Sequence, residues 1–164
     1  MHYAPQDLKH FLLNDVPAGS VGVVVGRAND IGIILRLADD GPASRILMLE
    51  GTLPFRVTNW GVAHASLRVV CQPHELRIRL GVPADGGNFE LPGVLTVHVG
   101  GAFIAAKRGE HGHDPIKIDL SSWTDASPGL AHGSFESYSD WEIGRVDERG
   151  HFVSLFQRKP PDNL

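Results

Sequence analysis

Short apolar runs separated by turn-forming residues dominate the chain from Val21 onward. Runs of Val, Ile and Leu alternate with clusters of Gly, Pro, Asn and Asp, which is typical of short strands joined by tight turns. The pattern predicts strands near 21–26, 31–38, 44–50, 65–71, 75–81, 94–99, 102–107, 116–120, 135–145 and 151–158. Because no long helical crossovers lie between them, we expect a mostly β, antiparallel fold, either a β-sandwich or a barrel.

The pattern differs at the N-terminus, over residues 5–14. Leu8, Phe11 and Leu12 recur at i, i+3 and i+4, the spacing of one face of a helix. We therefore expect one short N-terminal helix ahead of the strands.

A hairpin is predicted at Gly100-Gly101, with these two residues as the turn. Val99 would then face Ala102, and Val97 would face Ile104. One side of this ribbon would be wholly apolar, formed by Leu95, Val97, Val99, Ala102, Ile104 and Ala106. The other side, with His98 and Phe103, would be partly wet.

A second hairpin is predicted at the sequence DERG, residues 147–150, with Asp147 facing His151. In this register Arg145 faces Val153, and Ile143 faces Leu155. The core side would then hold Trp141, Ile143, Val153 and Leu155.

The ends of the chain set the expected domain boundaries. The final KPPDNL, residues 159–164, contains two prolines, which cannot donate to a ladder. We expect a single β-rich domain over 1–158 and a flexible C-terminal tail over 159–164.

Composition narrows the class of protein. The 164 residues are enough for one buried core, and 42% hydrophobic with 21% charged residues is a globular composition. The formal charge of −4 argues against a nucleic-acid surface. The first residues lack the pattern of a secretory signal, and no apolar run is long enough to span a bilayer. The chain has one cysteine, Cys71, which we expect to be a buried, inert thiol. These features favour a cytoplasmic protein without a membrane association.

The stretch KRGEHGHDPIKID, residues 107–119, holds the most suggestive chemistry. In an extended segment His111 and His113 point to the same side and can share a zinc ion, with Asp114 or Glu110 as a further ligand or general base. His98 lies beside the Gly100-Gly101 turn, whereas the loop with His111 and His113 leaves from the other end of the predicted strand 102–107, roughly 20 Å away. His98 is therefore too far away to be a third ligand. The sequence therefore predicts no cofactor, and the alternative is a divalent metal held by His111, His113 and Asp114.

Two sets of side chains are candidates for binding a partner. In LRIRLG, residues 76–81, alternation places Arg77 and Arg79 on one strand face. In the second hairpin Tyr138, Phe152 and Phe156 are expected opposite the core side, ringed by charge. Large aromatics with arginine are typical of protein interfaces, and no aromatic is interleaved with the arginines as a nucleic-acid reader would require.

The function that these features favour is a small intracellular non-catalytic protein-binding module, such as an immunity-type inhibitor or an accessory subunit. No nucleophile elbow and no phosphate-binding loop occurs. Two alternatives stay open: a metal-dependent β-barrel enzyme using His111 and His113, and a structural subunit of a larger assembly. The expected partner is another protein.

Overall fold

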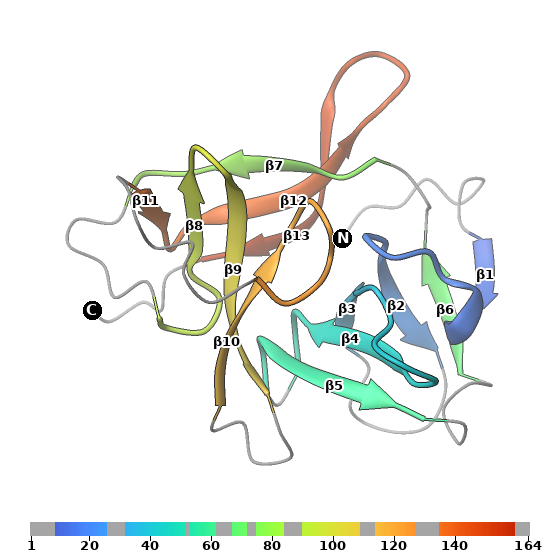
Figure 1. Cartoon of the computed structure of the whole chain (residues 1–164). Helices are drawn as coiled ribbons and strands as arrows, with labels where there is room; N and C mark the ends of the chain where they lie inside the picture. The colour runs from blue at the N-terminus through green and yellow to red at the C-terminus, as the bar shows by residue number, and fades with distance from the viewer. Residues whose placement is uncertain are drawn as a thin grey trace.

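The computed structural model describes residues 9–25, 32–51, 53–61, 67–71, 75–83, 90–108, 114–126 and 135–159. Within these residues the chain is almost entirely β, arranged in two sheets (Figure 1). The strands are β1 Lys9–Leu12, β2 Val21–Val25, β3 Ile33–Arg36, β4 Ser44–Met48, β5 Arg56–Trp60, β6 Arg68–Cys71, β7 Arg77–Leu80, β8 Leu95–His98, β9 Gly101–Arg108, β10 Asp114–Asp119, β11 Phe135–Tyr138, β12 Trp141–Val146 and β13 Phe152–Arg158.

The larger sheet, sheet A, has the strand order β1-β6-β2-β3-β4-β5-β9-β8-β11. Strand β10 lies off this path and also pairs with β9. The pairs of sheet A are antiparallel, except that β5 and β9 pair in parallel through Arg56 and Lys107. The smaller sheet B has the order β13-β12-β7 and is antiparallel. The mostly β, mostly antiparallel prediction is confirmed, and the arrangement is sandwich-like.

Sheet A is apolar on both faces. Leu35 on β3 belongs to a first core that sheet A shares with Trp141 and Ile143 of sheet B. Its neighbour Ile34 points the other way into a second core, which Leu13 from the N-terminal segment covers. Burial on both faces explains why the run IIL, residues 33–35, is continuously apolar rather than alternating.

The predicted N-terminal helix is wrong over its described part. Residues Lys9–Leu12 form β1, which pairs antiparallel with β6, and a single 3-10 turn, Leu13–Asp15, follows. Phe11 and Leu13 pack into the second core. Phe11 is partly buried against this core whereas Leu12 is 47% exposed, and pairing with β6 supplies the backbone hydrogen bonds of the strand.

The predicted strand 135–145 is one bent segment that serves both sheets. β11 pairs with β8 of sheet A, whereas β12 pairs with β13 and β7 of sheet B. The break falls at Ser139 and Asp140. A strand that changes sheets in this way forms a corner of the sandwich.

The two hairpins keep the predicted facing of most side chains but differ in register. Val97 pairs with Ala102 rather than with Ile104, so Val99-Gly100 is the turn and Val99 is fully exposed. The predicted apolar side survives without Val99, because a shift of two residues preserves which face a side chain occupies. On the other side Phe103 is buried rather than wet.

In the second hairpin Arg145 pairs with Val153 as predicted, but Ile143 pairs with Phe156 instead of Leu155. A β-bulge after Ile143 adds a residue on β13 and turns both Leu155 and Phe156 inward.

β5 was not predicted, because RVTNW buries only Val57 and shows little apolar signal.

No helix among the described residues is long and apolar enough to cross a membrane.

Candidate partner-binding surface

The outer face of sheet B is built by strict alternation along β7 and β12. Ile78 and Leu80 pair with Ile143 and Trp141, whose side chains point into the first core. Arg77 and Arg79 therefore lie on the opposite, solvent side. The sequence prediction that these two arginines share one strand face is consistent with this pairing.

Arg79 is held over an aromatic ring on this face. Its guanidinium carbon lies 4.1 Å from the centroid of Phe152, and Nη1 lies 3.7 Å from Oε1 of Glu142. Phe152 can lie flat here because Gly144 is beneath it: a Cβ added to Gly144 would come within 2.5 Å of the Phe152 ring. The structure thus brings together Arg79 and Phe152, two residues that the sequence proposed separately.

Arg77 is less firmly held. Its Nη2 lies 3.1 Å from Oε1 of Glu75, and these side chains are 57% and 77% exposed. Ion pairs this open to water contribute little to stability. Arg77 can exchange Glu75 for another carboxylate at small cost.

The second edge of β7 is unpaired among the described strands. The amide of Gly81 donates to the carbonyl of Asp140 at 3.0 Å, and hydrogen-bonded pairs alternate along an antiparallel ladder. Arg79 and Arg77 therefore bond to β12, whereas the backbone groups of Ile78 and Leu80 point away from it, toward the open edge. Leu80 is 40% exposed here, and Val82 just beyond is 80% exposed.

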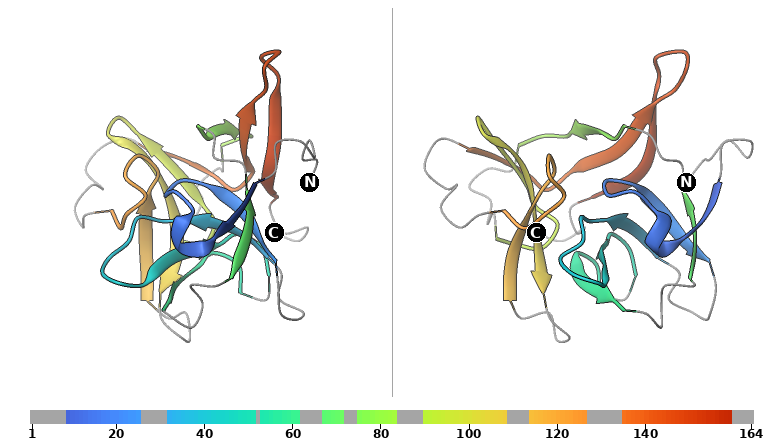
Figure 2. Two further views of the ribbon diagram at one scale, coloured as in Figure 1. Left: turned by 90° about the vertical axis from the view of Figure 1, so that its right-hand side faces the viewer. Right: turned by 45° about the vertical axis from the view of Figure 1, so that its right-hand side comes forward.

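The hairpin β12–β13, which belongs to sheet B, projects from the body of the molecule (Figure 2). Its tip is fixed by Asp147, whose Oδ1 accepts hydrogen bonds from the amides of Arg149 and His151 at 2.9 and 2.8 Å. The His151 and Arg149 amides lower the pKa of Asp147. The tip is therefore an ordered projection.

Two of the aromatics expected on the surface lie elsewhere. Phe156 is 5% exposed and packs against Phe55 and Trp141 in the first core, so its predicted outward orientation is wrong. Tyr138 is 6% exposed, and its hydroxyl donates to Glu136 at 2.5 Å, which raises the pKa of Tyr138. The surface is therefore formed by Arg77, Arg79 and Phe152 without these two.

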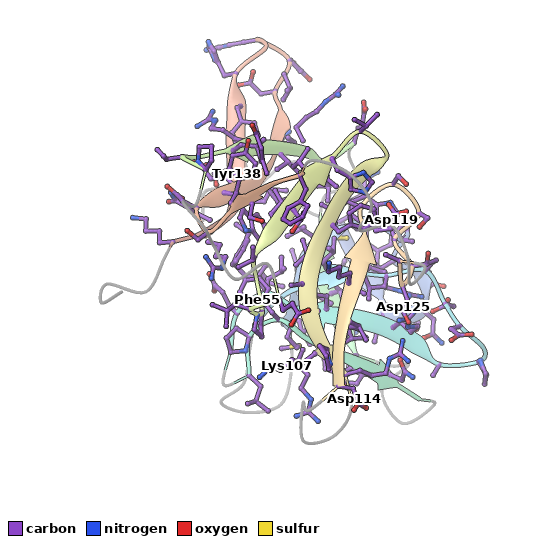
Figure 3. The ribbon with its side chains drawn as sticks, turned by 60° about the vertical axis from the view of Figure 1, so that its left-hand side comes forward. Phe55, Lys107, Asp114, Asp119, Asp125 and Tyr138 are labelled. Atoms are coloured by element: carbon purple, nitrogen blue, oxygen red, sulfur yellow. The ribbon has the colours of Figure 1, made fainter. Side chains whose placement is uncertain are left out.

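The candidate metal ligands are not gathered by the described part of the structure. His111 and His113 lie outside the described residues, and Asp114 begins β10 opposite Arg108. Among the described residues there is no group of three metal-binding side chains. Figure 3 shows Asp114 far from Tyr138, at the opposite end of the molecule.

His98 has a structural role at the first hairpin turn. Its Nδ1 accepts the amide of Gly100 at 2.8 Å, and its ring stacks on Phe103 with 5.0 Å between centroids. It lies at the opposite end of β9 from Arg108, as expected.

A network of three arginines, two of them buried, was not revealed by the sequence and joins β3, β4 and β9 to the segments that hold Asp39 and Asp125. Arg36 is 3% exposed and makes a bidentate pair with Asp39, with both distances 2.8 Å. Arg45 is 4% exposed and lies 2.6 Å from Asp125, which also binds Arg108. All three arginines have carboxylate partners, so the network holds loops together rather than offering a free cation.

Comparison of the chain with protein-family models, with curated proteins and with solved structures gave no match.

Proposed function

We propose that this protein is a non-catalytic protein-binding module and that it binds its partner through the outer face of sheet B. The observation that carries the proposal is the Arg79–Phe152 pair on that face, beside the half-exposed Arg77. Arginine and the aromatic residues, phenylalanine included, are enriched at protein–protein interfaces relative to the rest of the surface.

The geometry of the face supports this proposal. Phe152 and Glu142 both contact the Arg79 guanidinium group, and such contacts in the free protein reduce the side-chain entropy lost when a partner binds. The hairpin β12–β13 carries Phe152 and Glu142 of this face, and its projecting tip extends the surface available to a partner (Figure 1).

The test is affinity capture from an extract of the cells that make the protein. Three baits are compared: the wild type, the Arg77→Glu, Arg79→Glu double variant, and a matched Lys9→Glu, Arg68→Glu double variant. The control changes the same net charge on exposed residues of β1 and β6. All three baits are first shown to melt at similar temperatures.

We expect a protein that the wild type and the control retain in equal amounts and that the sheet B variant loses. Its direct binding is then measured with purified components by calorimetry. Equal retention by all three baits would contradict the proposed surface, and no specific retention by any bait would contradict the proposed function.

A further inference from the structure

We infer that the partner adds an extended, acidic strand to the open edge of β7. This inference rests on the proposed function and specifies its partner chemistry: a segment in which acidic residues alternate with apolar ones. Three features of the edge lead to it, namely its backbone, the charge on its outer side and the apolar residues at its end.

The backbone supplies the first feature. Ile78 and Leu80 direct their amide and carbonyl groups away from β12, as the bond from Gly81 to Asp140 fixes the phase of the ladder. No described strand pairs with this side of β7. An exposed edge of this kind is a template for an extended segment of another chain.

The outer side supplies the second feature. A strand added to β7 has alternate side chains on the same face as Arg77 and Arg79. Directly opposed side chains of neighbouring strands lie about 5 Å apart, so carboxylates at these positions would reach the guanidinium groups. Arg77 and Arg79 are 57% and 54% exposed, and within the described part of the chain their ion pairs are with Glu75 and Glu142.

The other side of the added strand meets apolar residues. Leu80 pairs with Trp141 at the margin of the first core and is still 40% exposed, and Val82 is 80% exposed. An apolar residue between two acidic ones would cover part of Leu80. The edge therefore selects a pattern that is acidic on one side and apolar on the other.

A second copy of this chain is a poor occupant for the same edge. Antiparallel pairing of two β7 strands would bring the arginines of both copies onto one face, and like charges opposite each other are destabilising. The occupant is therefore a different protein with the opposite charge at alternate positions.

The test uses a display library of random dodecapeptides selected on the full-length protein. We expect enriched peptides with acidic residues at alternate positions and apolar residues between them. Synthetic copies should protect the amides of Ile78 and Leu80 from hydrogen exchange, read by nuclear magnetic resonance. They should bind the Arg77→Glu, Arg79→Glu variant at least about tenfold more weakly.

A pair of variants separates backbone from side-chain recognition. Leu80→Pro removes the amide that points outward and leaves the bonds between Arg79 and β12, whereas Leu80→Ala keeps that amide. We expect Leu80→Pro to lose binding and Leu80→Ala to retain most of it. If Leu80→Pro does not fold, strand addition is tested instead by whether bound peptide protects the Ile78 and Leu80 amides of the wild type from hydrogen exchange.

The outcomes distinguish this inference from the proposed function. A partner captured through Arg77 and Arg79 that leaves the Ile78 and Leu80 amides unprotected would overturn strand addition while the binding function stands. Enriched peptides without alternating acidic residues, equal losses in Leu80→Pro and Leu80→Ala, or no enrichment over the arginine variant would each overturn the inference.

Discussion

Arg36 and Arg45 show how single residues constrain this fold. Both guanidinium groups are buried near the ends of β3 and β4, where Asp39 and Asp125 neutralise them. A buried arginine without its partner is costly, because the unpaired charge stays in a medium of low polarity. The sequence shows RLADDG as a turn, and only the folded geometry reveals which of its carboxylates neutralises Arg36.

Replacing Asp39 by alanine should therefore destabilise the protein by about 2 kcal/mol, less than for a fully buried pair because Asp39 itself is half-exposed. Denaturant unfolding measures the change, and Asp40→Ala, at the exposed neighbour, is the matched control. Equal effects of the two substitutions would show that the Arg36 contact has no special weight.

The same pair makes stability depend on pH. The hydrogen bond from Arg36 lowers the pKa of Asp39, so its stabilising effect is present above its unfolded pKa of about 3.9 and is lost as pH falls through the lower folded value. The wild type should lose stability between about pH 5 and 2 more steeply than Asp39→Ala. Parallel curves for the two proteins would contradict this.

Cys71 is the other residue with a clear chemical expectation. It is fully buried, and burial raises its pKa to about 11. Alkylation by iodoacetamide at pH 8 should therefore be undetectable in the folded protein and rapid in denaturant, because the thiolate is the reactive form. Rapid labelling under native conditions would show that the second core is open.

At the scale of elements, the alternation of apolar and polar residues predicted which face a side chain occupies better than it predicted pairing. LRIRLG correctly places Arg77 and Arg79 together, and the first hairpin keeps its apolar side despite a shift in register. Phe156 was misplaced because a bulge changes the facing by one residue, and a bulge has no composition signal of its own here. β1 was missed because most of its residues are exposed, and β5 because Val57 is its only fully buried residue.

Gly144 tests the packing of sheet B. A Cβ at this position would lie 2.4 Å from the Val153 carbonyl and 2.5 Å from the Phe152 ring. Gly144→Ala should cost about 1–3 kcal/mol in unfolding free energy and move Phe152 away from Arg79. Gly61→Ala is the control, since a Cβ there meets no described atom within 4 Å, and a similar loss in both variants would contradict the proposed contact.

At the scale of the whole molecule, Trp141 links the two sheets. It is 1% exposed on β12, and its indole N–H donates to the Gly93 carbonyl at 2.8 Å, while the Gly93 amide donates to Ala105 on β9. The sequence identified Trp141 as a core residue from its place in the hairpin. It could not identify Gly93 as its partner, because 48 positions separate the two residues.

Trp141→Phe should lower stability by about 1–3 kcal/mol, because it leaves a buried carbonyl without a donor. If both sheets unfold as one unit, circular dichroism and Cys71 labelling should report the same lowered midpoint. A variant in which the labelling midpoint is unchanged would show that sheet A unfolds independently.

The central claim is that the edge and outer face of sheet B bind another protein through charge. The most direct measurement is the dissociation constant of the captured partner for the wild type and for the Arg77→Glu, Arg79→Glu variant, by calorimetry at one salt concentration. We predict a loss of at least about tenfold, corresponding to about 1.4 kcal/mol, with a partial recovery when the acidic residues of the partner are changed to lysine. An unchanged dissociation constant, in a variant that melts like the wild type, would contradict the claim.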